Sequence, residues 1–427
     1  MITIIIGTVL LLLALFGTPL FAIISLIALL AFTFVDIDTS VLMVSLYRLA
    51  STPILLAIPL FTFAGYLLAE SNTPRRLVNF SRAFIGWLPG GLSVVTLVSC
   101  AVFTAFTGAS GVTIIALGGL LYPVLLKENY PEKFSLGMLT ASGNLGLLFP
   151  PSLPIILYGL VSEVSIDKLF IAGIIPGILM VVLLSLYSVF YMRNIKVETT
   201  PFSWQNAWKA TKEAAWEIPL PFIILIGIYG GFFTATEAAA VTAFYVLVIE
   251  VFIYRDLNLK RDLPRVMRES MVLVGGILII LGAALGLANY MIDAEIPMKI
   301  LDFMKNFITS KALFLITLNI FLLIVGAMMD IFSAIMVVVP LIIPIANNFG
   351  VDPVHLGIIF LANLGIGYST PPVGMNLFIA SFRFNKPIVR LYTAALPFLI
   401  ILLVALMLIT FIPEMSLWLV RIFSPAG

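Results

Sequence analysis

Thr107-Gly108-Ala109-Ser110-Gly111 stands at the centre of residues 83–126, a run of 44 residues that carries no charge. A helix needs about 20 apolar residues to cross the hydrocarbon layer of a membrane. The run is therefore too long for one crossing, and small residues interrupt it at its middle. This pattern predicts two helices that meet at a tight tip, a hairpin over residues 91–126. The apolar stretch around Gly326 to Asp330 has the same form and predicts a second hairpin over residues 311–347.

The composition places both hairpins in a membrane protein. Hydrophobic residues make up 62% of the 427 residues and charged residues 10%, against about 45–50% and about 25% in soluble chains. A cytosolic globular enzyme is excluded, because so apolar a domain has too little polar surface. The net charge of +2 gives no electrostatic reason to expect nucleic acid as a partner. One Cys and one His exclude transition-metal centres and Cys–His catalysis. We expect an all-α polytopic membrane protein without enzymatic activity or a cofactor.

The basic residues indicate the orientation of the chain. Lys and Arg accumulate on the cytoplasmic side of membrane proteins. If the N-terminus lies outside and both hairpins re-enter the membrane, 17 of the 23 basic residues fall on the cytoplasmic side. The opposite threading inverts this ratio, so both termini are predicted on the periplasmic side. The first residues show no cleavable signal, and we expect residues 2–16 to be a retained membrane helix.

The two halves of the chain share one order of parts. Each half has three helices, a short amphipathic segment, a hairpin, a broken helix and a last helix. Gly146-x-x-x-Pro150-Pro151 in the first half matches Gly367-x-x-x-Pro371-Pro372 in the second. The halves begin on opposite sides of the membrane, so the repeat is inverted. Inverted repeats with paired broken helices predict a secondary transporter whose site lies between the repeats; duplication of a helical bundle without transport is the structural alternative.

The predicted boundaries follow from these parts. The first inverted repeat covers residues 1–192, and the second covers residues 216–427. Between them, the polar residues 193–215 form a cytoplasmic linker with an interfacial amphipathic stretch at 201–216. The broken helices are expected at 133–160 and 354–381. Other helices are expected at 2–16, 19–35, 50–69, 169–192, 216–233, 236–254 (interrupted by Glu250), 270–291 and 391–413, with amphipathic segments at 74–88 and 296–309.

The Pro pairs give a physical reason for a site. Proline removes a backbone donor and blocks the preceding turn, so each pair frees carbonyl oxygens where backbone must be buried in protein or line a cavity. Freed carbonyls and helix C-terminal ends can bind a small cation, and helix N-terminal ends can hold a carboxylate. For either pair alone a plain kink is the alternative. Hard oxygen ligands suited to sodium stand near both breaks: Thr107, Ser110, Asn144, Asn363, Ser369 and Thr370.

Asp330 is the charged candidate. A charge at the bilayer centre costs about 2.5–3.5 kcal/mol on insertion scales, which makes this carboxylate a functional candidate by default. Asp330 can also cap the second helix of its hairpin, and both roles can hold together. Asn144 and Asn363 have an alternative too, a hydrogen bond between helices. Glu237 fits a capping box with Thr234.

Four segments carry a family resemblance. They are Gly326-Ala-Met-Met-Asp-Ile-Phe-Ser, Val339-Pro-Leu-Ile-Ile-Pro-Ile, Gly350-Val-Asp-Pro-Val-His-Leu-Gly-Ile-Ile and Thr370-Pro-Pro-Val-Gly-Met-Asn-Leu. These segments resemble the large membrane subunit (M subunit) of tripartite ATP-independent periplasmic (TRAP) transporters. Those transporters belong to the ion-transporter superfamily. Residues 230–241 are similar to another signature of that subunit, with Ala235 where the family more often has Pro. The similarity covers essentially the whole chain.

The resemblance implies a sodium-coupled importer of organic acids in the inner membrane of a bacterium or archaeon. It also implies an elevator mechanism and two partners: a small four-helix membrane subunit on a separate chain and a periplasmic substrate-binding protein. Carried onto this sequence, the first sodium site comprises Thr107, Gly108, Ser110, Asn144, Gly146 and Pro150. The second comprises Gly326, Asp330, Asn363, Gly367, Thr370 and Pro371. The substrate lies between them, at Ser110, Asn144, Asp330, Ser369 and Thr370.

Two other functions stay open at this point. A self-sufficient sodium–dicarboxylate symporter of the same superfamily shares the inverted-repeat design. A membrane scaffold or assembly protein is the alternative without transport. ATP-driven pumping is not expected, because the chain has no G-x-x-x-x-G-K-[ST] motif. The sequence leaves the substrate open among C4-dicarboxylates, sialic acid, other sugar acids and keto acids.

Overall fold

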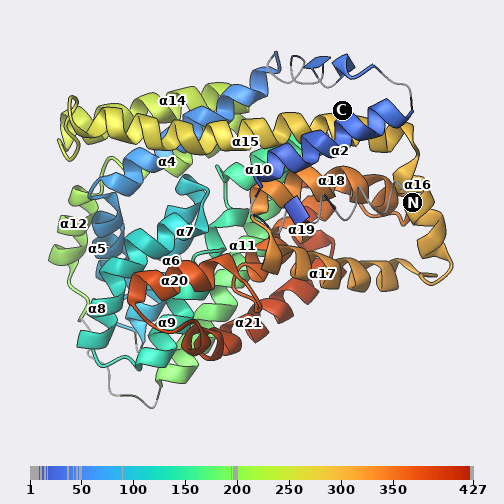
Figure 1. Ribbon diagram of the computed structural model, residues 1–427. Helices are drawn as coiled ribbons and strands as arrows, with labels where there is room; N and C mark the ends of the chain where they lie inside the picture. Colours follow the sequence, from blue (N-terminus) through green and yellow to red (C-terminus); the bar gives the residue numbers. More distant parts are fainter. Residues whose placement is uncertain are drawn as a thin grey trace.

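The computed structural model describes residues 18–423 apart from 36–37, 42, 45–46, 48–50, 89, 194 and 196–200, together with residues 9, 12, 13 and 16. All of the regular elements in this described part are helical (Figure 1). Seven of its helices are long and apolar enough to cross a membrane, or up to eight if the bent pair Glu132–Leu148 and Leu153–Ser162 is one span. The expected all-α polytopic membrane fold is confirmed. The helix predicted at 2–16 falls almost entirely outside the described residues.

The first half of the chain contains the first predicted hairpin as a pair of helices. These are α6 (Gly91–Thr107) and a second arm that runs from Ser110 to Lys127 and includes a π-helical turn. The helices of this half are α2 (Leu20–Phe34), η1 (Pro53–Leu56), α4 (Ala57–Glu70), α5 (Thr73–Ile85), α6 (Gly91–Thr107), α7 (Ser110–Thr113), η2 (Ile114–Gly118), α8 (Gly119–Lys127), α9 (Glu132–Ser142), η3 (Leu145–Leu148), α10 (Leu153–Ser162) and α11 (Ile166–Met192).

The second half contains the second predicted hairpin as two helices of 18 residues each, α17 and α18. Its helices are α12 (Trp204–Glu213), α13 (Pro219–Tyr229), α14 (Ala235–Val248), η4 (Ile249–Ile253), α15 (Asp262–Asp293), α16 (Ile296–Lys305), α17 (Lys311–Met328), α18 (Ile331–Asn348), α19 (Pro353–Gly367), α20 (Met375–Phe384), α21 (Ile388–Phe411) and α22 (Glu414–Phe423). The amphipathic stretch expected at 201–216 is present as α12.

Two differences from the expected helices concern α15 and α22. Helix α15 begins at Asp262, eight residues before the expected start at 270, because a charged stretch continues the apolar span as helix. Helix α22 was not expected at all. It has 10 residues, too few to cross a membrane, so a search for long apolar runs passes over it. Its Ser416, Leu417 and Val420 are buried, as in a helix that packs with one face.

The helices form two groups (Figure 1). Helices α2, α4, α14 and α15 lie as one layer along the top of the view, where α4 packs against α14 and α2 against α15. The hairpins and broken helices lie together below this layer. Helix α19 runs through their centre, and every residue from Val354 to Gly367 is buried. A helix that is apolar on all sides is buried in this way.

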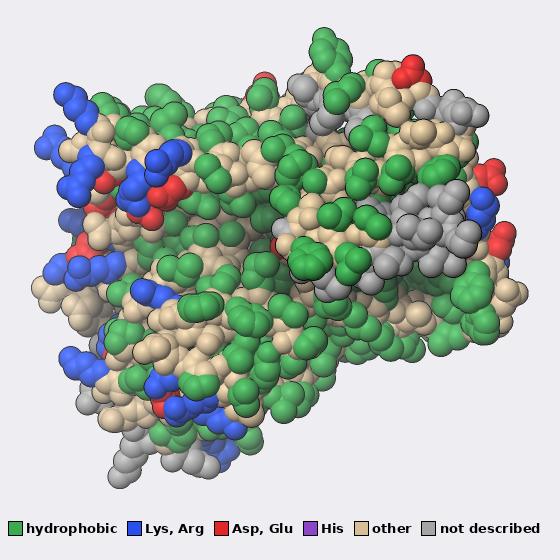
Figure 2. Space-filling model, viewed as in Figure 1, with side chains coloured by type: hydrophobic (Ala, Val, Ile, Leu, Met, Phe, Trp, Pro, Cys, Tyr) green, Lys and Arg blue, Asp and Glu red, His purple; other side chains and the backbone are tan. Residues whose placement is uncertain are grey.

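The surface separates charge from apolar area. On the face seen in Figure 2, hydrophobic side chains cover a wide middle region, and most of the Lys and Arg side chains lie along the left of the view, from the turn between α14 and α15 past α5 and α12 to the lower end near α8 and α9. This distribution suits a protein whose middle lies in lipid and whose basic end meets water.

Candidate functional site

The tip of the first hairpin is built on Gly108. Helix α6 ends at Thr107, Gly108 has a left-handed φ of 64°, Ala109 is extended, and α7 begins at Ser110. A Cβ at Gly108 would lie 2.6 Å from Cβ of Leu153, the first residue of α10. The position therefore needs glycine for two reasons, its conformation and its close contact. The structure thus brings the first tip onto the helix that follows the first Pro pair.

The first break is packed against α6. Helix α9 ends at Ser142, a 3₁₀ turn follows, and the two parts of the broken helix are bent by 47°. A Cβ at Gly146 would collide with the backbone of Ala101 and Ala105 in α6. The hydroxyl of Thr104 donates to the carbonyl oxygen of Gly143 at 3.1 Å. Gly146 therefore lets the broken segment lie directly on the first arm of the hairpin.

The tip of the second hairpin is built on Asp330. Helix α17 ends at Met328, Met329 is extended, and Asp330 is the N-cap of α18. One carboxylate oxygen of Asp330 accepts from the backbone N–H of Ser333 at 3.0 Å, and the other accepts from the Ser333 hydroxyl. The capping role considered for Asp330 is confirmed. The capping box of Thr234 and Glu237 is confirmed as well.

The second tip also touches the second break. A Cβ at Gly367 would lie 2.7 Å from Cα of Gly326, so these two glycines allow α17 and the end of α19 to meet backbone to backbone. The backbone N–H of Gly374 donates to the carbonyl oxygen of Ala327 at 2.9 Å. The hydroxyl of Tyr368 accepts from the backbone N–H of Ile331. The second tip and the second break are thus together, as predicted.

A chain of four buried, neutral side chains joins the two halves; we name Ser110, Asn376, Asn144 and Ser369 the central polar chain. The hydroxyl of Ser110 donates to Oδ1 of Asn376 at 2.8 Å. Nδ2 of Asn376 donates to Oδ1 of Asn144 at 2.7 Å, and Nδ2 of Asn144 donates to Oγ of Ser369 at 3.0 Å. All four side chains are buried. The first tip, the first break and both sides of the second break therefore share one hydrogen-bonded chain.

Asn376 is the member of this chain that the sequence did not reveal. It is fully buried near the start of α20. The signal available was a lone carboxamide in the apolar segment Gly374-Met-Asn-Leu-Phe-Ile, a few residues after the second Pro pair. The corresponding position after the first Pro pair is Ile155, so comparison of the halves gave no reason to select it.

Asn363 lies away from the second tip. Its Nδ2 donates to Oδ1 of Asn319 and to the carbonyl oxygen of Ile359, at 2.8 Å each. Asn319 in turn donates to the hydroxyl of Thr410 in α21 at 3.0 Å. Asn319 precedes Gly326 by seven residues on α17, about two helical turns. The structure therefore gives Asn363 the bond between helices that was its alternative role.

The other predicted site residues differ in exposure. The hydroxyl of Thr370 donates to the carbonyl oxygen of Ile366 at 2.9 Å, within its own segment. Pro371 is exposed, whereas Pro150 is buried. The hydroxyl oxygens of Thr107 and Ser152 are buried and have no hydrogen-bond partner among the described residues. Thr107 directly precedes Gly108, and Ser152 directly precedes Leu153. The contact between Gly108 and Leu153 joins the first tip to α10.

The fold defines a class first, the polytopic helical membrane proteins. A solved structure described as the YdaH transporter of Alcanivorax borkumensis is similar in fold, with a TM-score of 0.63 over 87% of this chain and 86% of that chain at 14% identity. The family follows from sequence: the model of the "Tripartite ATP-independent periplasmic transporter, DctM component" matches residues 4–415. The chain belongs to this family. It is a transporter permease for organic solutes and not an enzyme.

Curated relatives agree with this family. The chain is 38% identical to the C4-dicarboxylate TRAP transporter large permease protein DctM of Pseudomonas aeruginosa, over 88% of each chain. It is 37% identical to the isethionate TRAP transporter permease protein DctMQ of Oleidesulfovibrio alaskensis, over 85% of this chain and 58% of that one. It is 34% identical to the ectoine/5-hydroxyectoine TRAP transporter large permease protein UehC of Ruegeria pomeroyi, over 86% of this chain and 85% of that one. The resemblance seen in the sequence is confirmed.

Proposed function

We propose that this large permease imports an organic acid together with sodium across a bacterial inner membrane, in a complex with a small four-helix membrane subunit, from a periplasmic binding protein that delivers the solute. Relatives named for C4-dicarboxylate and for isethionate support an acidic solute. The system named by the family is tripartite, which supports two further components beside this chain.

The central polar chain is the observation that carries the proposal. Ser110, Asn144 and Ser369 were expected at the substrate site, and they are linked through Asn376. Buried polar groups between apolar helices are costly unless they are paired, so a chain of them between the halves favours a binding role. Carboxamide N–H and hydroxyl groups can donate to a carboxylate, and their oxygens can face a cation. Solute and sodium therefore find suitable partners in one place.

The sodium sites are proposed at the two tips. At the first tip, the buried hydroxyls of Thr107 and Ser152 lack partners among the described residues, so they are free to coordinate a hard cation. At the second tip, Asp330 supplies a carboxylate beside the close contact of Gly326 and Gly367. Oxygen ligands of this kind suit small hard cations. Oδ1 of Asn363 is buried and has no hydrogen-bond partner among the described residues, so it can offer this oxygen to the second site while Nδ2 stays bonded to Asn319.

The packing supports two inverted repeats and an elevator motion. Each half was expected to begin with three helices, and the second of these in one half packs on the third in the other. Helix α2 packs on α15, and α14 packs on α4. Such exchange is what a two-fold relation between residues 1–192 and 216–427, joined by 193–215, would produce. In the proposed motion the α2–α4–α14–α15 layer stays in place, and the hairpins with the broken helices carry the solute across, both hairpins re-entering the membrane and both termini outside.

Reconstitution tests this proposal. The chain is placed in liposomes with and without a small subunit and a binding protein, under an inward sodium gradient, and uptake of a C4-dicarboxylate is measured. Asn376→Ala is expected to reduce uptake at least 10-fold, because it leaves Ser110 and Asn144 without their shared partner. Asn348→Ala is the matched control, since the Asn348 side chain is exposed and, among the described residues, donates to the carbonyl oxygen of Pro344 in its own helix.

Three outcomes contradict parts of the proposal. Full-rate uptake by the chain alone would favour the sodium–dicarboxylate symporter. Uptake that does not respond to the sodium gradient would refute the coupling ion. Equal uptake by Asn376→Ala and Asn348→Ala would remove the central polar chain from the site. Sialic acid, ectoine and isethionate replace the dicarboxylate in parallel assays to define the solute.

A further inference from the structure

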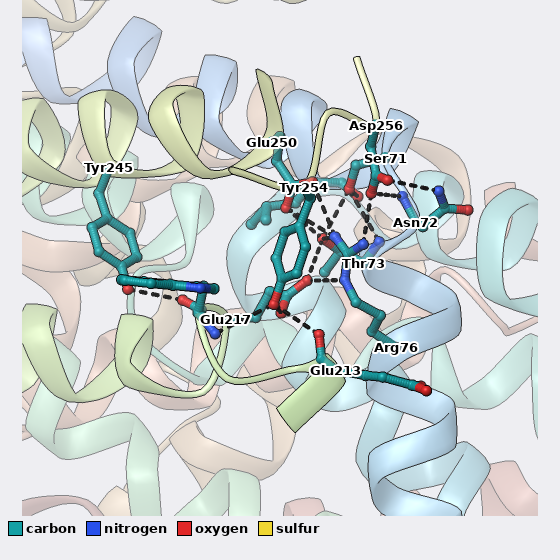
Figure 3. A network of polar contacts seen from close by, with 12 residues as sticks. Ser71, Asn72, Thr73, Arg76, Glu213, Glu217, Tyr245, Glu250, Tyr254 and Asp256 are labelled. Atoms are coloured by element: carbon teal, nitrogen blue, oxygen red, sulfur yellow. Dashed lines mark hydrogen bonds and ion pairs between the residues drawn. The ribbon is translucent and has the colours of Figure 1, made fainter. Parts of the chain in front are cut away.

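Arg76 lies at the centre of a buried ion cluster outside the proposed transport site (Figure 3). Its guanidinium contacts three carboxylates from the second half of the chain: Glu217 before α13, Glu250 in η4 and Asp256 after η4. Nη2 lies 3.0 Å from Oε2 of Glu250, and Nη1 lies 2.7 Å from Oδ2 of Asp256. The side chains of all four residues are at most 11% exposed. We name these four residues the Arg76 cluster.

The residues before Arg76 bond to the same carboxylates. The hydroxyl of Thr73 donates to Glu250 at 2.9 Å. Both the backbone N–H and the side-chain amide of Asn72 donate to Asp256, at 2.9 Å each. The ring of Tyr254 lies 3.8 Å from the guanidinium carbon of Arg76, a cation–π contact. The first turn of α5 is therefore attached to the second half by several directed contacts (Figure 3).

Two members of the Arg76 cluster, Arg76 and Asp256, are held in their charged forms. Burial lowers the pKa of Arg76, but the carboxylates of Glu217 and Glu250 raise it more, so the net direction is upward. Burial raises the pKa of Asp256, but hydrogen bonds from Asn72 and Arg76 outweigh it and hold the pKa below its ordinary value. Removing one partner from a buried ion pair is strongly destabilising. The contact between Arg76 and Asp256 is therefore an ion pair at neutral pH.

The other end of α5 holds the first hairpin. Arg82 forms an ion pair with Glu128, the residue that follows α8. Arg76 and Arg82 are six residues apart, about 9 Å along a helix. Helix α5 also packs against α6. One short helix thus connects two parts of the second half, the residues before α13 and those at the end of α14, to both arms of the first hairpin.

The equivalent helix of the second half has no such attachment. Helix α16 precedes the second hairpin as α5 precedes the first. Within the described residues, its ion pair joins Lys305 to Asp302 of the same helix at 3.9 Å, and Lys299 bonds to the carbonyl oxygen of Ala294. The pocket between α16 and the second hairpin is lined by apolar side chains, with Ile300, Phe303 and Met304 contributed by α16. The two connecting helices are fastened differently.

We propose that Arg76 is a positioning residue for transport: it fixes α5 as a strut that sets the place of the first hairpin relative to α14. The inference rests on the proposed function, because it assigns Arg76 to the conformational step of transport and not to the binding of solute or sodium. Loss of the strut lets the first hairpin take several positions, so fewer transporters complete the step in a given time. The affinity of the central polar chain for solute stays the same.

The test removes the charges: each acid is replaced by its amide of the same shape, and Arg76 by the neutral and shorter glutamine. The fourfold variant Arg76→Gln/Glu217→Gln/Glu250→Gln/Asp256→Asn leaves a neutral hydrogen-bonded cluster with no buried unpaired charge. Spin labels at Phe244→Cys on α14 and Leu126→Cys on α8, both exposed positions, report the distance between layer and hairpin by double electron–electron resonance. Cys100 is buried and does not compete for label. Arg265→Gln/Glu70→Gln, an exposed ion pair, is the matched control.

The fourfold variant is expected to broaden the distance distribution at least twofold and to lower the maximal uptake rate about 10-fold, with KM unchanged. The control pair is expected to change neither. An unchanged distribution, or a KM that rises while the distribution stays narrow, would overturn the proposal. If the fourfold variant does not fold, Asp256→Asn alone is measured and must broaden the distribution to a smaller extent. The distance measurement needs no solute, so a failure of the proposed function appears in wild-type uptake and leaves this test standing.

Discussion

The two Pro–Pro breaks have the same sequence pattern and different surroundings. Pro150, Pro151 and Ser152 are buried, whereas Pro371, Pro372 and Val373 are exposed. Packing on α6 and α10 holds the first break. The second break packs on α17 at Gly367, but its exposed Pro pair is held by hydrogen bonds such as the one from the Tyr392 hydroxyl to the carbonyl oxygen of Pro372 at 2.6 Å. A repeated motif therefore places a break at the same point in each half, and the neighbouring helices decide whether the break is buried or exposed. We name the buried break at Pro150-Pro151 the closed break and the exposed one at Pro371-Pro372 the open break.

The residues directly before each Pro pair also differ, being apolar at the first break and polar at the second. Leu148 and Phe149 precede the first pair, and Ser369 and Thr370 precede the second. The first break contributes its polar side chain earlier, from Asn144, which lies in the central polar chain with Ser369. Both breaks thus reach one polar centre from different positions of their motifs. From this difference we expect the first break to stay fixed by its packing and the second to be free to move.

The largest effect is expected from a methyl group at the closed break. Gly146→Ala forces a Cβ against the backbone of α6, at 2.5 Å from N of Ala105, and overpacking of a core costs about 1–3 kcal/mol. In Gly367→Ala the new Cβ meets Gly326 at 2.7 Å, but it lies beside the open break. The loss of stability is therefore expected to be smaller than in Gly146→Ala. Thermal unfolding in detergent, followed by size-exclusion fluorescence, measures both.

Gly275→Ala is the matched control for these two variants. Gly275 lies in the middle of α15, and a Cβ there has nothing within 4 Å. Its thermal midpoint is expected to equal that of the wild type or to rise slightly, since alanine has the higher helix propensity. An equal fall of the thermal midpoint in Gly146→Ala and Gly367→Ala would show that the exposed second break does not relax to accommodate the added methyl group.

A middle-sized effect is expected at the second tip, where Asp330 is the N-cap of the second arm and the first tip has Ala109 in that position. Asp330→Ala removes the N-cap of α18 and is expected to cost about 1 kcal/mol. Asp330→Asn keeps a capping oxygen and is expected to retain the thermal midpoint. If the carboxylate binds sodium, both variants raise the sodium concentration needed for half-maximal uptake. A normal sodium titration in Asp330→Asn would restrict this residue to capping.

The tips and the breaks were predictable from the sequence because each is a local signal. Gly108 and Asp330 interrupt long apolar runs, and the Pro pairs are contiguous. Asn376 was missed because its partners, Ser110 and Asn144, lie more than 230 residues away. A hydrogen bond over such a separation depends on how the two halves dock, which no local pattern records.

The Arg76 cluster was missed for a related reason. Arg76, Glu217 and Asp256 each stand near the predicted end of an apolar segment, where a charge is ordinarily solvated. Glu250 was visible as an interruption of the segment 236–254, but the sequence gave no partner for it. The partner is 174 residues earlier in the chain. Short amphipathic α22 was missed because span length, the main signal for membrane helices, does not register a 10-residue helix.

The smallest effect on stability is expected at Thr370, on the open break. Its hydroxyl donates to the carbonyl oxygen of Ile366 in its own segment, and the residue is half-buried. Thr370→Ala is expected to change the free energy of unfolding by no more than about 0.5 kcal/mol. Thr317→Ala is the matched control, because the exposed hydroxyl of Thr317 makes the same kind of bond, to the carbonyl oxygen of Leu313 at 2.9 Å.

The two threonines separate a local role from a transport role. If Thr370 helps to form a cation site at the second tip, Thr370→Ala raises the sodium concentration for half-maximal uptake several-fold, and Thr317→Ala leaves it unchanged. An unchanged sodium titration in both Thr370→Ala and Asp330→Ala would remove the second tip from cation binding. The coupling ion would then be held at the first tip, by the closed break and its unpartnered hydroxyls of Thr107 and Ser152, and the open break would serve movement alone.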